Sequence, residues 1–404
     1  MNHPHSRTRD RWQPRPKPRR AAFVLTGSLL APFLVLLPIA GIAFALRAND
    51  ARPGSERQLL HHAAVPQREN ERYLYASPEF TAFVLDSYRQ TPTQKIPEFY
   101  EWMSESYGKH GPRISGDADQ DLGAEIENER QSLSKISDPE ARSIEELKLG
   151  AWLHQWVKAI GPKFSLDRGF EFANLVRSGE RQCFLQSIII AGLLQAAGID
   201  AGVVMVNRSM QGSESNNGHA VTLLKLTSGE DVLVDASEPT PFPSHQSLFI
   251  NDLGPKRLRY VEPVFRSDNG RITGYASVPN RGRMETRRVR PLDRTFLKSQ
   301  FDYYRGERTP GGLLCKPMTP EGLRTSAELL ERSIHECPAN PLPAYMLAKA
   351  YLAAGDNDRA RAQIGNAYRQ YAGIGWVPLN CRSAYEQMSK AATKTALNGR
   401  QAGR

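Results

Sequence analysis

Cysteine is scarce in this chain. Four cysteines among 404 residues are too few for a small domain held together by disulfides. No Cys-x-x-Cys pair occurs and no Cys/His spacing fits a zinc site, so we expect neither a metal nor a cofactor. Cys183 stands alone in the middle of the chain, whereas Cys315, Cys337 and Cys381 fall near its end. One disulfide among these last three is expected, and the sequence leaves open which two would pair.

Excess charge is also missing from most of the chain. The net charge is +10, but the first twenty residues hold seven basic side chains and one acidic one, so this tail carries +6 and all other residues together +4. The body is therefore close to neutral, and the overall charge says little about its ligand. We expect no nucleic-acid partner.

Charged residues are absent from residues 21–46, which follow the basic tail of residues 1–20. About 20 apolar residues are enough to cross a bilayer, so this run predicts a transmembrane helix. A cleaved secretory signal is the alternative, because residues 43–45 resemble a cleavage site, but a signal core normally has only about 7–15 apolar residues. In both cases the basic flank stays in the cytoplasm and the body is exported. We expect a single-pass bacterial inner-membrane protein whose body faces the periplasm.

The body divides by composition into four segments. Residues 47–75 are polar and predict a linker, and residues 76–142 hold many aromatic side chains and predict a helical region. The main domain is expected at residues 143–300. Residues 315–397 show helical periodicity, and the small and apolar residues within 347–367 resemble the two helices of a tetratricopeptide repeat. An ordinary helical hairpin is the alternative, and in either case these helices are a possible binding site for a protein partner.

A helix is predicted directly after Cys183. Residues 184–197 are strongly apolar and typical of a buried helix, and Gly198 supplies its C-terminal stop. Residues 143–161 precede it with apolar side chains at helical spacing. Cys183 therefore lies at or within one turn of a helix N-terminus, where the pKa of a thiol is lowered. Arg181 would lower it further if its side chain points toward the thiol.

Three short apolar runs follow and predict β-strands. They are residues 201–206, 219–226 and 232–234, and the last two form a hairpin. His219 opens the second run, and Asp235 closes the third. With the turn expected at residues 227–230, Asp235 falls a few residues short of direct opposition to His219. A bulge or a strand twist is needed to bring these two side chains together.

Cysteine, histidine and aspartate in this order suit nucleophilic catalysis. A cysteine thiolate attacks, a histidine takes and returns the proton, and an acid holds the histidine in the required tautomer. Taken singly, each residue also has an ordinary structural role, as a packed thiol, a polar strand end or a turn former. Together, Cys183, His219 and Asp235 predict a catalytic triad. His245, which follows Asp235 in a proline-rich loop, is the alternative base.

Residues 144–239 resemble the transglutaminase-like superfamily, a circularly rearranged relative of the papain fold. The similarity rests on RSGERQCFLQSIIIAGLLQAAGIDAGVVMV, NNGHAVTLLKL and VLVDASEP. In this family a cysteine opens a buried helix that ends in a Gly-Ile-x-Ala turn, a histidine opens the next strand, and an acid closes the one after. Gln182-Cys183-Phe184 is also similar to the Gln-Cys-Trp of true transglutaminases, with phenylalanine in place of tryptophan.

The resemblance implies an α+β fold in which the helix bearing Cys183 packs on an antiparallel sheet. It also implies acyl transfer through a thioester on Cys183, with a protein or peptide as substrate. The backbone N–H of Cys183 would help to bind the oxyanion, and Gln182 is the nearest candidate for a second donor. Water as acceptor gives a peptidase or amidase, which we expect for an exported bacterial member, whereas an amine gives cross-linking. The alternative is an inactive scaffold that binds envelope partners through its C-terminal helices.

Overall fold

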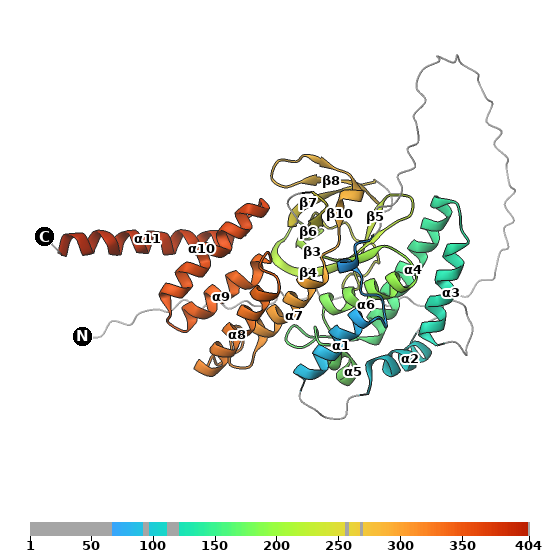
Figure 1. Ribbon diagram of the computed structural model, residues 1–404, viewed down its shortest axis with the longest axis horizontal. Coiled ribbons are helices and arrows are strands. Elements are labelled where there is room, and N and C mark those ends of the chain that lie inside the picture. Colours follow the sequence, from blue (N-terminus) through green and yellow to red (C-terminus); the bar gives the residue numbers. More distant parts are fainter. Residues whose placement is uncertain (1–66, 92–96, 111–120, 255–257, 267–269, 403–404) are drawn as a thin grey trace, which may run out of the picture. The chain divides into compact units, whose positions relative to one another are not determined.

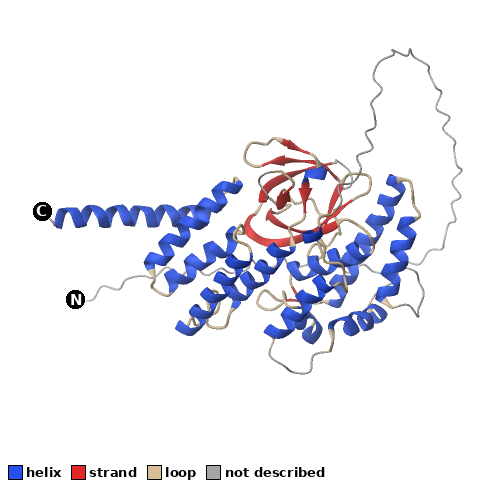
Figure 2. Ribbon diagram, in the orientation of Figure 1, coloured by secondary structure: helices blue, strands red, loops and turns tan. Residues whose placement is uncertain are grey.

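A computed structural model describes residues 67–91, 97–110, 121–254, 258–266 and 270–402. The expected basic tail and transmembrane segment (residues 1–46) lie outside the described residues, as does most of the expected linker. Within the described ranges, no helix is both long and apolar enough to cross a membrane. Helices and one large antiparallel sheet make up this part of the chain, so the predicted α+β class is confirmed (Figure 2).

A set of helices precedes the sheet in the chain (Figure 1). They are η1 (Glu69–Glu71), α1 (Pro78–Gln90), α2 (Phe99–Lys109), α3 (Leu122–Ser134) and α4 (Pro139–Ile160). The aromatic side chains of this region provide contacts between helices. Phe80 of α1 lies edge-on to Phe172 with 5.6 Å between the ring centroids, and Tyr107 of α2 lies edge-on to Trp152 of α4 at 5.9 Å. Ring pairs of this geometry add stabilisation beyond that from the burial of their apolar area.

Helix α6 (Cys183–Ala196) has Cys183 as its first residue, as the sequence predicted. It ends before Gly198, which has the left-handed φ of +79° that favours glycine. Most of its side chains are apolar and they lie on all sides, so the helix is buried along its length. Helix α5 (Phe172–Ser178) and the parallel pair β1 (Lys163–Phe164) and β2 (Glu180–Arg181) precede it, and α6 packs against strands β3 and β4.

The large sheet is antiparallel throughout. Its strands are β3 (Ala201–Arg208), β4 (Glu214–Lys225), β5 (Asp231–Val234), β6 (Ser247–Asp252), β7 (Leu258–Phe265), β8 (Ile272–Ser277), β9 (Arg283–Met284) and β10 (Val289–Arg290). They follow the order β10-β6-β3-β4-β5-β8-β7, with β9 paired to β8. Because β6 also pairs with β7, the strands from β6 round to β7 close into a barrel. The sequence did not predict this closure.

One predicted strand boundary was wrong. Strand β4 begins at Glu214, so His219 lies inside the strand instead of opening it. Of the polar residues before His219, Glu214 pairs with Arg208 of β3 beyond a register shift, whereas His219 itself pairs with Val206. Strand pairing is made by backbone groups, so it does not require the apolar side chains on which the prediction relied.

Five helices follow the sheet. They are α7 (Arg294–Arg308), α8 (Pro320–Glu336), α9 (Pro341–Ala353), α10 (Asn357–Ile374) and α11 (Leu379–Ala402), and each packs against the next in the chain. The expected hairpin is formed by α9 and α10, and its residues Leu347, Ala360 and Ile364 are buried. Its assignment to the tetratricopeptide repeats stays a prediction.

All four cysteines are unpaired in the structure, so the expected disulfide is not formed. Burial raises the pKa of Cys337 and of Cys381 to about 11. These two thiols are therefore almost fully protonated at neutral pH and are poor nucleophiles. Cys315 is partly exposed, and its Sγ donates to the carbonyl of Arg308 at 3.3 Å.

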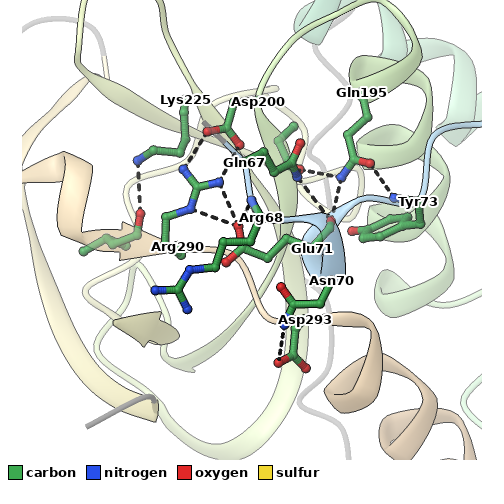
Figure 3. Close-up of polar contacts among 12 residues, drawn as sticks. Gln67, Arg68, Asn70, Glu71, Tyr73, Gln195, Asp200, Lys225, Arg290 and Asp293 are labelled. Carbon is green, nitrogen blue, oxygen red and sulfur yellow. Dashed lines mark hydrogen bonds and ion pairs between the residues drawn. The ribbon is translucent and has the colours of Figure 1, made fainter. Parts of the chain in front are cut away.

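A buried charge cluster ties the start of the described chain to the barrel (Figure 3). The Arg290 guanidinium donates to Glu71 Oε2 from Nε at 3.0 Å and from Nη2 at 2.8 Å. Its Nη1 donates to Asp200 Oδ2 at 2.7 Å. Segments far apart in sequence are thus joined by one side chain of β10.

Candidate active site

The three residues predicted to form a triad meet near the start of α6. Cys183 opens that helix, His219 lies on β4, and Asp235 directly follows β5. His219 Nε2 lies 2.7 Å from Asp235 Oδ2. The Cys183 side chain lies beside the His219 ring, and the interaction of the two side chains raises the pKa of His219. The imidazole therefore lies between a thiol with which it can exchange a proton and a carboxylate that can orient it, as such chemistry needs.

Asp235 reaches His219 diagonally across two strands. Thr222 pairs with Val234, so Asp235 continues β5 opposite Val221, two positions from His219. Residues two positions apart on a strand point to the same face, and diagonal neighbours lie within reach of long side chains. The pairing of β4 with β5 runs without a bulge. The expected bulge is therefore absent between β4 and β5, and the diagonal placement of the two side chains closes the gap.

His219 and Asp235 strongly perturb each other's titration. Burial alone would lower the pKa of His219, but the hydrogen bond to Asp235 and the neighbouring Cys183 raise it to about 11. Burial would likewise raise the pKa of Asp235, but the hydrogen bonds from His219 and His245 hold it well below its usual value. At neutral pH the imidazole is therefore protonated beside an ionised carboxylate. This is the state in which a histidine can donate a proton to a leaving group.

His245 shares the carboxylate with His219. Its Nε2 lies 3.0 Å from the same Asp235 Oδ2, and its ring lies edge-on to that of His219 at 5.4 Å. The side chain of His245 is 1% exposed, whereas that of His219 is 26% exposed. Because Cys183 lies beside His219, this residue and not His245 is placed to exchange protons with the thiol.

These histidines and Asp235 also form the one His/Asp cluster, among the described residues, whose donor atoms lie close enough together to be considered for a metal ion. Their separations argue for shared protons instead. The two imidazole nitrogens lie 2.7 and 3.0 Å from the carboxylate oxygen, which are hydrogen-bond distances. Ligand atoms about 2.1 Å from a tetrahedral zinc ion lie about 3.4 Å apart. A metal would therefore have to force the cluster open.

The first turn of α6 has no side chain that caps its N–H groups. By contrast, Asp138 accepts from the first turn of α4 and Asp293 from that of α7. Uncapped N–H groups at a helix start favour negative charge, so the backbone of Cys183 suits the binding of an oxyanion. Gln182, the expected second donor, is the N-cap residue and is buried, and its Oε1 has no hydrogen-bond partner. Its role in binding the oxyanion stays a prediction.

Helix α4 holds the loop that follows Asp235. His154 Nε2 and Lys158 Nζ lie 3.0 and 2.9 Å from the carbonyl oxygen of Glu238. Asp235 Oδ1 accepts from the backbone N–H of Ser237 at 2.9 Å, so the loop in turn orients the carboxylate. His154 was not predicted from the sequence. The available signal was its four-residue spacing from Lys158, which puts both side chains on one face of the helix.

Access to the thiol is narrow. Cys183 is 6% exposed, so the more exposed His219 ring marks the approach from solvent. Two hollows in the described part of the chain, of about 460 and 350 Å³, lie along α1 and between α1 and α7. Neither is lined by a triad residue. These hollows are therefore not the approach to Cys183.

Gly169 supports the backbone that leads into the site. A Cβ at this position would lie 2.3 Å from the carbonyl oxygen of Arg181 and 2.6 Å from that of Ser165. Backbone atoms cannot swing aside, so we expect Gly169→Ala to shift the segment before Cys183 and to lower the free energy of unfolding by about 1–3 kcal/mol. Urea unfolding and the alkylation rate of Cys183 measure the two effects. Gly282→Ala is the matched control, because the nearest atom to its Cβ lies at an ordinary 3.6 Å. Equal effects of the two substitutions would contradict this account.

Comparison with known proteins does not identify a family for this chain. No protein-family model matches the chain, and no curated protein matches it. The functional proposal therefore rests on the geometry of Cys183, His219 and Asp235.

Proposed function

We propose that this chain is a cysteine-dependent acyl-transfer enzyme that works through a thioester on Cys183. The observation that carries the proposal is His219, which lies beside Cys183 and 2.7 Å from the Asp235 carboxylate. A histidine that serves only as a packed core residue has no need of both partners. A nucleophilic cysteine needs both, one to exchange the proton and one to hold the imidazolium.

The reaction proceeds in two halves. The Cys183 thiolate attacks the acyl carbon, and the N–H groups at the start of α6 stabilise the oxyanion. The bond to the leaving amine breaks as protonated His219 gives that amine its proton, which leaves a thioester on Cys183. A water molecule then gives its proton to His219 and its oxygen to the acyl carbon. The carbon–sulfur bond breaks, which releases the carboxylic acid and restores the Cys183 thiolate beside protonated His219.

The wider proposal places this chemistry in the cell envelope. The basic tail and the uncharged run of residues 21–46 support attachment to a bacterial inner membrane, with the body in the periplasm. The resemblance of residues 144–239 to the transglutaminase-like superfamily supports a protein or peptide substrate. We favour hydrolysis over transfer to an amine, and we propose that the helices from α8 onward bind a protein partner.

Acyl-enzyme formation tests the proposal without knowledge of the substrate. The full-length chain is incubated with p-nitrophenyl acetate, and the acetyl group is located by peptide mass spectrometry. We expect a burst of nitrophenolate, acetylation of Cys183 that hydroxylamine removes, and loss of both in Cys183→Ala. Cys315→Ala is the control, because this partly exposed thiol lies outside the triad. Acetyl transfer to an added primary amine, instead of to water, would redirect the proposal to cross-linking.

A non-enzymatic scaffold is the second candidate, and the burial of the thiol favours it. At 6% exposure, Cys183 could be a packed helix residue that no substrate reaches. In that case Cys183→Ala and the unsubstituted chain would release nitrophenolate at the same rate. That result would favour the scaffold function over the enzymatic one.

A further inference from the structure

Arg181 places a positive charge beside the nucleophile. Gln182 between them is extended, with φ −137° and ψ 158°, so the side chains of Arg181 and Cys183 leave the backbone on the same side. Arg181 Nη1 donates to Gln186 Oε1 at 3.1 Å, and Gln186 lies about one turn after Cys183 on α6. The charges of Cys183 and Asp235 act on the guanidinium. The cation is thus fixed at the start of α6 beside the triad.

One edge of this guanidinium has no protein acceptor. Among the described residues, Gln186 is the hydrogen-bond acceptor of Arg181, and no carboxylate forms an ion pair with it. Its Nε is buried without a partner. Arginine is the side chain best built for a two-pronged contact with a carboxylate, through Nε and Nη2 together. A half-buried cation with that edge unmatched is costly unless a ligand supplies the acceptor.

The chain's own buried arginines show what this edge takes. Arg290 uses Nε and Nη2 to bind the Glu71 carboxylate, at 3.0 and 2.8 Å. Arg305 uses the same two atoms to bind Glu171, at 2.7 and 3.1 Å. In Arg181 the corresponding Nε has no such acceptor, although the guanidinium lies within electrostatic reach of Cys183 and Asp235.

We propose that the Nε/Nη2 edge of Arg181 binds a carboxylate of the acyl substrate next to the scissile bond. The inference rests on the proposed function and adds to it a substrate class, acidic peptides. The carboxylate comes either from an aspartate or glutamate side chain or from the peptide's own C-terminus. Arg181 is then a specificity residue in addition to a source of charge for the thiolate.

Two alkylating reagents that differ in charge test the proposal. Iodoacetate carries a carboxylate next to its reactive carbon and iodoacetamide does not, so the ratio of their rates at Cys183 reports on a carboxylate site. Relative to N-acetylcysteine, we expect the full-length chain to favour iodoacetate by about tenfold, the effect of one charge-assisted contact. Arg181→Gln should abolish this preference. Arg181→Lys should keep part of it, because lysine retains the charge but not the two-pronged geometry.

The outcomes separate this inference from the proposed function. Rapid alkylation with the same rate ratio in Arg181→Gln as in the unsubstituted chain would overturn the carboxylate site and leave the enzyme intact. Equal slowing of both reagents would mean that Arg181 serves only the thiolate, and would also overturn it. Alkylation no faster than that of N-acetylcysteine, and insensitive to His219→Ala, would overturn both proposals. Protection of Cys183 by N-acetylglycine or by N-acetylglutamate α-amide, lost in Arg181→Gln, supports the site and distinguishes a terminal from a side-chain carboxylate.

Discussion

Replacing His219 by alanine should slow the alkylation of Cys183 by iodoacetamide about hundredfold at pH 6, because an isolated thiol with a pKa of about 8.5 is almost entirely protonated there. In the unsubstituted chain, His219 is protonated beside the Cys183 side chain, and its pKa is raised to about 11 by Asp235 and Cys183 against the opposing effect of burial. A cation beside a cysteine sulfur favours the nucleophilic, negatively charged form, and His219→Ala removes that cation. Peptide mass spectrometry after timed exposure to the reagent measures the rate at Cys183 alone.

The pH dependence of the same reaction gives a second readout. We expect a nearly flat alkylation rate through neutral pH in the unsubstituted chain, and in His219→Ala a rate that rises with pH as an ordinary thiol ionises. His335→Ala on α8 is the control for this comparison. A flat profile that survives in His219→Ala would remove His219 from the mechanism.

The raised pKa of His219 also makes the stability of the fold depend on pH. Protonation of His219 stabilises the fold fully below the ordinary pKa of 6.5, and this contribution is lost as pH rises toward about 11.

The proximity of Cys183, His219 and Asp235 could be predicted because each of these residues has a local signal. The apolar run after Cys183 and the stop at Gly198 set both ends of α6. The short valine-rich runs set the strands that carry His219 and precede Asp235. The diagonal contact between His219 and Asp235 could not be predicted in this way, because it depends on the register of β4 against β5.

The barrel could not be predicted because its closure is not local. The contact that closes it pairs β6 with β7, while β6 also pairs with β3. The residues of β6 do not indicate that strands will pair with it on both edges. Strand pairing of this kind is decided by what the rest of the sheet leaves open.

The sharing of Asp235 by two histidines was hidden for a related reason. The sequence offered His219 and His245 as alternative bases, because a linear pattern suggests one partner for one carboxylate. In the structure a single oxygen, Oδ2, accepts from both. The buried His245 thus lies behind the carboxylate and helps to orient it, while the more exposed His219 lies toward the thiol.

The largest expected loss of stability comes from Arg290→Met. Arg290 is 1% exposed, and its substitution leaves the fully buried Glu71 carboxylate without its cation. Removing one partner of a buried ion pair costs about 3–5 kcal/mol, because the other charge stays in a medium that solvates it poorly. The cluster also joins η1, β10 and the segment between α6 and β3, so its loss should loosen the start of the described chain (Figure 3). Urea unfolding followed by circular dichroism gives the free energy.

Two further variants separate lost charge pairing from lost packing. Arg324→Met is the matched control, since the Arg324–Glu321 pair on α8 is 64% and 73% exposed and such surface pairs contribute at most about 1 kcal/mol. The double variant Glu71→Leu/Arg290→Met removes both buried charges, and it should be more stable than Arg290→Met alone, because a buried pair can often be replaced by apolar side chains at little cost. If the double variant is as unstable as the single one, the packing of the Arg290 side chain, and not the unpaired Glu71 charge, accounts for the loss.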